Sequence, residues 1–375
     1  MIYLDSAATT VQKPPQVAAA MARAMSGAAS PGRGGHRWGN EAARIVLDCR
    51  EAAAKLFHVP EPEQVILTFN ATHGLNIAIR SLVGPGMTVL ISGYEHNAVT
   101  RTLHAIPDLN VRVAAAEPFD TLGILERFRE ELRKGVDCVI CNHVSNVFGF
   151  ILPLEEIGGL CRRFDTPLIV DASQSSGCVT IDFTEIGAQF IAMPGHKGLY
   201  GPQGTGLLLC ARQGDPIFCG GTGSLSRLQE MPDFLPDRLE AGTPNVPGVA
   251  GLLEGLRFVS AVGVEKIGRY ERELIGKFGG LLTRIEGLRV YRAGDPGCQS
   301  GVLSFTVDEM DCERVGEWLS DRGVAVRAGL HCAPMAHESA GTLATGTVRV
   351  SVSAFNNIRE MERAAAILSQ LPRKK

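Results

Sequence analysis

Short apolar runs alternate with helical stretches along most of this chain, and this alternation constrains its fold more than any other feature. The runs predict strands at residues 65–69, 87–91, 111–114, 136–141, 168–170, 190–193 and 206–210. Helical patterns lie between them near residues 71–83, 97–105, 121–134 and 154–164. Strands separated by helices of about 10–15 residues form βαβ units. We therefore expect an α/β fold with a mostly parallel sheet covered by helices on both faces.

The C-terminal part follows a different pattern. A long helical region at 249–285 is interrupted near Val262-Gly263. Further elements are strands at 301–307, 324–327 and 347–352, a helix near 312–322, and a last helix on which apolar residues recur from Ile358 to Leu371. This pattern predicts a smaller α+β domain. We expect a large domain over residues 15–260 and a small one over 261–375, with residues 1–14 packing on the small domain.

Composition and charge exclude several classes of protein. The chain has 375 residues, enough to bury a core without disulfides or metal ions. Its 37 basic and 40 acidic residues give a net charge of −3, so no basic field would attract nucleic acid or acidic lipid. The N-terminus shows no secretory pattern, and no apolar run approaches the ~18 residues of a membrane span. We expect a cytoplasmic protein that binds neither nucleic acid nor membrane.

Ten cysteines are scattered between residues 49 and 332. In a long chain without a secretory pattern, they indicate reduced thiols and not a disulfide framework. Cys138 and Cys141 form a CxxC motif, which redox and metal sites also use. The motif lies inside an apolar strand, where residues three apart point to opposite faces, so we expect both thiols in the core. No metal site is predicted.

Three features at predicted strand ends carry chemistry. Ala71 and Thr72 begin a helix directly after a strand, where free backbone N–H groups bind anions. Asp171 ends an apolar strand, at the edge where open α/β sheets bind ligands. Lys197 lies in a glycine-rich turn, and a desolvated lysine is a nucleophile toward aldehydes. Each feature alone also fits a structural cap, a turn or an exposed loop. Together they form the minimal set for binding pyridoxal 5'-phosphate.

A further pair of residues lies in the C-terminal part. Cys332 follows a predicted strand in a loop, and Arg327 and His331 flank it, so they would favour the thiolate. Arg349, in the next strand, is able to clamp a carboxylate through two hydrogen bonds. A buried cysteine and a surface ion pair are the structural alternatives.

Several longer motifs make the chain recognisable from end to end. They are Tyr3-Leu4-Asp5-Ser6-Ala7-Ala8-Thr9-Thr10, Glu95-His96-Asn97, His143-Val144-Ser145-Asn146-Val147-Phe148-Gly149, Val170-Asp171 with Gln174, Gly195-His196-Lys197, Glu240-Ala241-Gly242-Thr243-Pro244-Asn245, and Arg327 through Cys332. With them the chain resembles the cysteine desulfurase and selenocysteine lyase family, a class V group of fold-type I pyridoxal-phosphate enzymes. The short stretch between Cys332 and Arg349 is similar to the branch with a compact cysteine loop.

The resemblance implies a role in cofactor binding for a set of residues. Lys197 would bond to the cofactor aldehyde and, once displaced, act as the base. Asp171 would pair with the ring nitrogen, Gln174 with the ring hydroxyl, and His96 would stack on the ring. Thr72 and His196 would hold the phosphate. The residue assigned to the phosphate of a neighbouring subunit is Thr243, which implies a homodimer with shared sites.

The resemblance also implies how substrate is handled. Asn146 and Arg349 would position an amino acid, with Arg349 binding its carboxylate. The Cys332 thiolate would attack the substrate sulfur, giving alanine and a persulfide for a sulfur acceptor protein. His36 lies in a loop that lines the site in relatives, and His96 would donate protons. Pro194 departs from the family pattern, because relatives have a serine or threonine there that gives the phosphate a hydroxyl.

Three functions remain open from the sequence. The first is a desulfurase acting on L-cysteine. The second is a selenocysteine lyase or another class V enzyme such as an aminotransferase. The third is a sulfur-carrier scaffold without catalysis. The setting of Cys332 favours sulfur or selenium chemistry, and intact Lys197, Asp171 and Arg349 argue against the scaffold.

Overall fold

A seven-stranded sheet forms the centre of the computed structural model, which describes residues 1–32 and 35–372. Its order is β2-β8-β7-β6-β5-β3-β4, and β8 runs antiparallel to both neighbours while the other pairs are parallel. The strands are β2 (Val65–Thr68), β3 (Thr88–Ser92), β4 (Asn110–Ala114), β5 (Cys138–Asn142), β6 (Leu168–Asp171), β7 (Phe190–Pro194) and β8 (Gly206–Cys210). The mostly parallel α/β architecture is confirmed, and every residue of β5 to β8 is buried.

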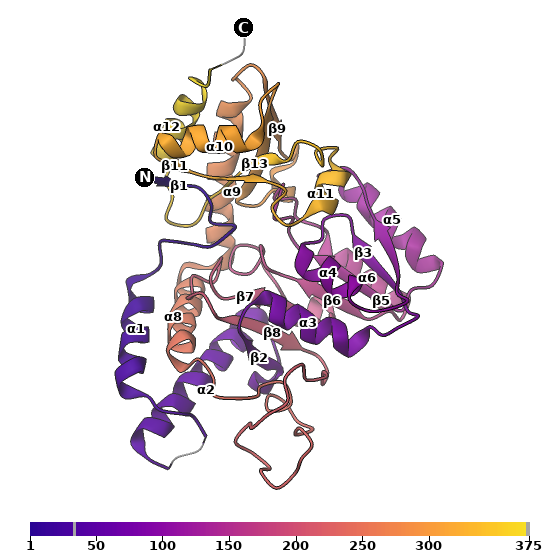
Figure 1. Cartoon of the computed structure of the whole chain (residues 1–375), viewed down its shortest axis with the longest axis vertical. Helices are drawn as coiled ribbons and strands as arrows, with labels where there is room; N and C mark the ends of the chain where they lie inside the picture. Colours follow the sequence, from indigo (N-terminus) through magenta and orange to yellow (C-terminus); the bar gives the residue numbers. More distant parts are fainter. Residues whose placement is uncertain (33–34, 373–375) are drawn as a thin grey trace.

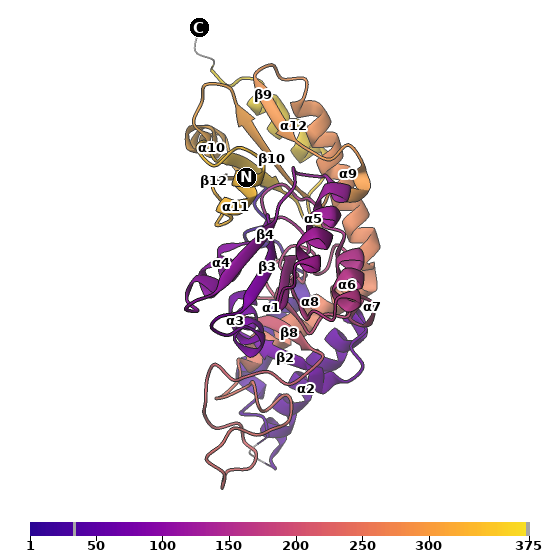
Figure 2. The ribbon, with the colours of Figure 1, turned by 90° about the vertical axis from the view of Figure 1, so that its right-hand side faces the viewer.

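Helices cover both faces of this sheet, as Figure 2 shows. One face carries α3 (Ala71–Leu82) and α4 (Asn97–His104). The other carries α5 (Thr121–Arg133), α6 (Leu154–Arg163), α7 (Phe183–Ile186) and α8 (Val246–Val262). Side-chain caps start several of them: Asn70 accepts a hydrogen bond from the N–H of His73, and Asp120 from that of Gly123. These caps fix where the helices begin at the strand ends.

Two long helices near the N-terminus were not predicted from the sequence. These are α1 (Pro15–Gly27) and α2 (Arg37–Phe57), and they pack against α8 (Figure 1). Ala20 and Ala24 of α1 meet Ala250 of α8 in a small cluster of buried side chains. A short 3-10 turn, η1 (Pro62–Gln64), then leads into β2.

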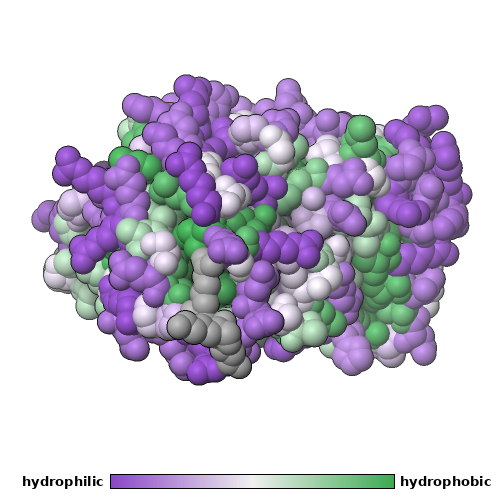
Figure 3. Space-filling view, turned by 90° about the horizontal axis from the view of Figure 1, so that it is seen from above, coloured by the Kyte–Doolittle hydropathy of each residue, from purple (hydrophilic) through white to green (hydrophobic). Residues whose placement is uncertain are grey.

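The C-terminal part builds a second, antiparallel sheet of order β12-β13-β10-β9. Its strands are β9 (Leu288–Tyr291), β10 (Val302–Val307), β12 (Arg327–Gly329) and β13 (Thr347–Ser351). The helices α9 (Val264–Leu282), α10 (Cys312–Asp321) and α12 (Ile358–Leu368) share a buried apolar cluster with this sheet. This part of the chain also contains η2 (Pro296–Cys298) and α11 (Pro334–Ser339), and Ala336 of α11 belongs to the apolar core of the large sheet. The end of the molecule that this part forms shows hydrophobic areas between hydrophilic residues (Figure 3).

The strand predicted at 324–327 was wrong in one respect, because it divides between two sheets. β11 (Val324–Ala325) pairs in parallel with β1 (Ile2–Tyr3), and β12 then pairs with β13. The chain changes partner at Val326, so each strand is short. This arrangement places the N-terminal residues against the C-terminal part, with Leu4 in the same buried cluster as Phe305.

The predicted boundary after residue 260 falls in the last turn of α8. The next helix, α9, begins after Gly263, and the two helix axes differ by 81°. No single helix among residues 1–32 and 35–372 has both the length and the apolar character needed to span a membrane. The bent pair α8 and α9 meets that test by length and composition only.

Candidate active site

The carboxyl ends of the parallel strands gather most of the predicted site residues around one cavity. Those that line it are Ala71, Thr72, His96, Asn146, Asp171, Gln174, His196 and Lys197. The cavity is also lined by Ser173 and Pro194, and it lies at the sheet edge where α/β proteins bind ligands. The β-strand topology therefore brings together residues that are far apart in the chain.

The turn that carries Lys197 is tightly packed, which explains its glycines. A Cβ atom at Gly195 would overlap Oγ1 of Thr205, and one at Gly198 would overlap the backbone oxygen of Ser176. Burial, with Arg349 and Arg327 nearby, lowers the pKa of Lys197 from 10.5 to about 8, against the opposing effect of Asp171. About a tenth of this amine is therefore neutral and nucleophilic at pH 7, far more than for an ordinary lysine.

Asp171 is the last residue of β6, and His96 lies after β3 as the capping residue of α4. The Asp171 carboxyl is buried at the end of β6, and its Oδ1 accepts a hydrogen bond from the N–H of Ser173 at 2.9 Å. The Nδ1 atom of His96 accepts from the N–H of Ala98 at 3.0 Å. Burial lowers the pKa of His96, so the ring is neutral and its proton lies on Nε2.

The start of α3 provides an anion site at the same cavity. Asn70 caps the helix, and the N–H groups of a first helical turn have no intrahelical acceptors. His196 lies opposite, with its Nδ1 atom 3.0 Å from Oγ1 of Thr9. Burial lowers the pKa of His196 to about 4, so it is neutral. Thr72 and Ser173 bring hydroxyl groups into this cavity, where Pro194 brings none.

The N-terminal segment crosses from the small sheet to the Lys197 turn. Its Thr10 donates from both N–H and Oγ1 to the backbone oxygen of His196, at 3.1 and 3.0 Å. The Nε2 atom of Gln174 donates to the backbone oxygen of Ala7 at 3.0 Å. The motif beginning at Tyr3 therefore braces the cavity from outside, a role that the sequence alone did not indicate.

Arg349 lies next to this segment and is almost fully buried. Its Nη2 atom forms an ion pair with Oδ1 of Asp5 at 2.7 Å, and its Nη1 atom donates to the backbone oxygen of Asn146 at 3.0 Å. Its Nε atom has no hydrogen-bond partner among the described residues. Sequence reasoning missed Asp5, although it lies in one of the motifs that revealed the family.

Cys332 is exposed on a loop that residues of the large domain hold in place. Its backbone oxygen accepts from the N–H of Asn97 at 2.7 Å. The oxygen of the preceding residue, His331, accepts from Nδ2 of Asn146 at 2.8 Å. Both His331 and Cys332 have left-handed backbones, with φ of 51° and 57°. Two non-glycine residues in this region are strained, which is typical of a functional loop held by its surroundings.

One expectation for this loop was wrong. His331 does not act as a cation beside the thiol, because its ring is buried and its Nε2 atom lies 3.1 Å from the backbone oxygen of Thr347. Burial lowers the pKa of His331 well below its usual value, so the ring is neutral. The cation beside Cys332 is Arg327, whose Nη2 atom lies 3.8 Å from Sγ.

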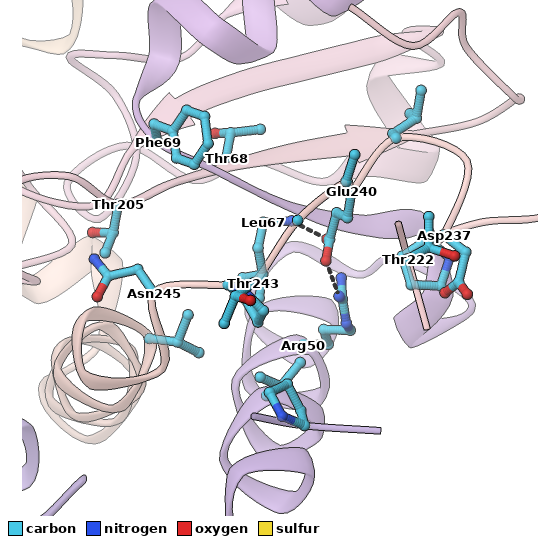
Figure 4. A pocket seen from close by; sticks show the side chains of 18 of the residues that line it. Arg50, Leu67, Thr68, Phe69, Thr205, Thr222, Asp237, Glu240, Thr243 and Asn245 are labelled. Atoms are coloured by element: carbon cyan, nitrogen blue, oxygen red, sulfur yellow. Dashed lines mark hydrogen bonds and ion pairs between the residues drawn. The ribbon is translucent and has the colours of Figure 1, made fainter. Parts of the chain in front are cut away.

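Four predicted residues are not part of the lining of the Lys197 cavity. Cys332 and Arg349 contact residues next to it, whereas His36 and Thr243 lie elsewhere. His36 is exposed and caps α2, with Nδ1 accepting from the N–H of Gly39 at 3.2 Å. Thr243 lines a second cavity, with Thr205, Asn245 and exposed Phe69 around it (Figure 4). This chain alone therefore does not bring Thr243 to the cavity of Lys197.

A buried ion pair holds the segment that carries Thr243. Nη2 of Arg50 lies 2.6 Å from Oε2 of Glu240, whose Oε1 accepts from the N–H of Leu67 at 2.6 Å (Figure 4). Replacing Glu240 with alanine leaves a buried guanidinium without a counter-charge, and we expect the free energy of unfolding to fall by about 3–5 kcal/mol. Urea unfolding measures this. The double variant Arg50→Met with Glu240→Ala should lose less than the single one, and an equal or larger loss would contradict the account.

The comparisons with known proteins agree with this geometry. The sequence model of the family Aminotransferase class-V matches residues 2–364. The chain therefore belongs to the class-V aminotransferase family.

Three proteins similar to this chain are named as cysteine desulfurases. A probable cysteine desulfurase of Methanothermobacter thermautotrophicus is 30% identical, over 99% of this chain and 94% of the relative. One of Xylella fastidiosa is 32% identical, over 98% and 90%. The solved apo structure of a cysteine desulfurase from Thermococcus onnurineus has a TM-score of 0.90 at 28% identity, covering 99% of this chain and 94% of that one.

Proposed function

We propose that this protein is a pyridoxal 5'-phosphate-dependent cysteine desulfurase that passes the sulfur of L-cysteine to Cys332. The observation that carries the proposal is the position of the Cys332 loop: Asn97, at the start of α4, and Asn146, in the segment after β5, hold it beside the cavity of Lys197. Curated relatives named as cysteine desulfurases support the same activity. A transaminase would have no use for an exposed thiol held in this way.

The residues around the cavity fit the cofactor. When bound, pyridoxal phosphate acts as an electron sink for the substrate. Lys197 would bond to its aldehyde and Asp171, buried and free of any ion pair among the described residues, would pair with the ring nitrogen. The start of α3, with Thr72, would hold the phosphate, and Ser173 is a second hydroxyl in a cavity where Pro194 offers none.

Side chains of the protein itself would carry out the remaining steps of the reaction. Arg349 would bind the substrate carboxylate, with Asp5 and Asn146 fixing the guanidinium. Lys197 would take the α-proton, because its neutral amine is a base. The Cys332 thiolate would then attack the substrate sulfur: an S–S bond forms, the C–S bond breaks, and its electron pair stays on carbon. Two protons complete alanine: Nε2 of His96 would supply one to Cβ, and Lys197 would return the α-proton to Cα.

The pKa of Lys197 gives this proposal a pH signature. Only the neutral amine attacks an aldehyde, and its pKa is lowered to about 8, so capture of pyridoxal phosphate should accelerate as pH rises, with a midpoint near pH 8. Stopped-flow absorbance of cofactor-free protein measures the rate. Burial also lowers the pKa of Lys13 to about 8, so Lys13→Met is the control and should keep the same midpoint. A midpoint near 10 would contradict a desolvated Lys197.

We also propose that two copies of this chain form a homodimer in which Thr243 serves the partner's site. Thr243 lies in the second cavity beside Phe69 and Phe218, whose rings are more than half exposed and pack near His73. An exposed aromatic surface of this kind is typical of an interface. Sedimentation should give twice the chain mass of 40.1 kDa. A monomer that binds the cofactor tightly would contradict the shared site.

The activity itself is tested with purified protein loaded with pyridoxal phosphate and given L-cysteine. We expect alanine and, with a thiol reductant, sulfide in equal amounts. If the protein binds pyridoxal phosphate but forms no alanine, the desulfurase activity is wrong and the proposed cofactor binding stands. A much higher rate with L-selenocysteine would instead identify the selenocysteine lyase.

A further inference from the structure

A closed set of hydrogen bonds lies beneath the cavity, where β3 and β5 end side by side. The Oγ atom of Ser92 lies 2.6 Å from Oε1 of Glu95 and 2.8 Å from Oδ1 of Asn142. Oε1 of Glu95 also accepts from the N–H of Asn142 at 2.8 Å. Nδ2 of Asn142 donates to the backbone oxygen of Tyr94 at 3.0 Å. All four residues are buried.

The number of hydrogens in this set is informative. The bond to the Tyr94 oxygen fixes the amide of Asn142, so the atom facing Ser92 is the acceptor Oδ1. Ser92 has one hydroxyl hydrogen, and it donates this hydrogen to Oδ1 of Asn142. The 2.6 Å contact between Ser92 and Glu95 then joins two oxygens and lacks a hydrogen, unless Glu95 supplies one. A carboxylate cannot donate, whereas a carboxylic acid can.

The surroundings of Glu95 point the same way. No arginine or lysine in the described part of the chain forms an ion pair with it, and its Oε2 atom is buried without a hydrogen-bond partner. The charged group facing it is another carboxylate, Asp171, and the thiol facing it is that of Cys141. Burial, and then Asp171, raise the pKa of Glu95 to about 8, against the opposing effect of its hydrogen-bonding contacts with Ser92 and Asn142.

We propose that Glu95 is a positioning residue that carries a proton in the folded protein and donates it to Ser92. As a neutral acid it ties the end of β3 to the end of β5. The residue after Glu95 is His96, which caps α4. Asn142 pairs in register with Asp171 of β6. The proton of Glu95 therefore removes a second carboxylate charge from beside Asp171.

The charge on Glu95 can be measured directly by isoelectric focusing of the folded protein. The isoelectric point predicted from the sequence is about 6.3, well below the pKa of about 8 for Glu95. Glu95→Gln should therefore focus with the wild type, since it replaces one neutral group by another. The matched control is Glu362→Gln, on the exposed face of α12, which should move to higher pH. A Glu95→Gln shift as large as that of the control would overturn the proposal.

An infrared measurement covers the case in which Glu95→Gln does not fold. Glu271 is the other buried glutamate whose pKa burial raises to about 8, and it lies apart from the cavity against Tyr200. Glu271→Gln removes its carboxylic-acid carbonyl band, and the band of Glu95 should remain at pH 7. Loss of all carboxylic-acid absorbance in that variant would show that Glu95 is ionised.

The positioning role has its own readout, the equilibrium dissociation constant for pyridoxal phosphate. Above pH 8 Glu95 ionises and repels Asp171, so the ratio of the wild-type constant to that of Glu95→Gln should rise about tenfold between pH 7 and pH 9. A flat ratio would contradict the role. This part rests on the proposed function, whereas the charge measurements need neither cofactor nor substrate, so each can fail separately.

Discussion

Replacing Cys332 with alanine should lower the formation of alanine from L-cysteine by about a thousandfold or more, while the cofactor stays bound. The reason is that the substrate sulfur leaves carbon only if a nucleophile accepts it, and Cys332 is the exposed thiol next to the cavity. Chromatographic detection of alanine over time, together with the visible absorbance of the bound cofactor, separates loss of chemistry from loss of binding.

The chain offers a matched control for this variant. Cys219 is the other exposed cysteine, and it lies in the segment between β8 and α8. Cys219→Ala should keep the wild-type rate. If Cys332→Ala keeps most of its activity with L-cysteine, transfer of sulfur to this thiol is wrong, even though the family assignment would stand.

Replacing Lys197 with alanine should have an effect of similar size on turnover and a larger one on the cofactor. The variant loses both the amine that bonds to the cofactor and the base for the α-proton, and loss of a general base alone costs about 10²- to 10⁴-fold. Lys197→Arg should be equally inactive, because a guanidinium stays protonated and cannot attack an aldehyde. Alanine formation and borohydride trapping of the cofactor on the protein measure the two losses.

Lys13 again provides the comparison, since it is a partly buried lysine on the same side of the cavity. Its Nζ atom donates to Oγ1 of Thr10 at 2.9 Å. Lys13→Met should still be trapped with the cofactor on Lys197. Trapping on another lysine, or full activity in Lys197→Ala, would show that the predicted lysine is not the one that binds the cofactor.

The large sheet was predictable because its central strands, β5 to β8, are buried on both faces. Continuous apolar runs such as those of β5 and β7 stand out in the sequence, and turns and capping residues mark where the helices begin. The edge at which Asp171 and Lys197 meet follows from that topology alone. The roles of individual residues came from the family resemblance, and they stay predictions until the variants are measured.

Other features left little or no signal in the sequence. The buried positions of α1 are Val17, Ala20 and Ala24, and alanines do not mark an apolar face. β9 is a half-buried edge strand and lacks a clear alternation. The ion pair between Arg349 and Asp5 joins opposite ends of the chain, so no local pattern reveals it. The neutral state of His331 depends on burial, which flanking residues do not show.

The most direct test is mass spectrometry of the holoenzyme after a single turnover with L-cysteine, without added thiols. The account predicts that the peptide containing Cys332 gains one sulfur atom, in step with one alanine released per site, and that the peptide containing Cys219 is unchanged. Alanine released without sulfur on Cys332, or with the sulfur on Cys219, would contradict it.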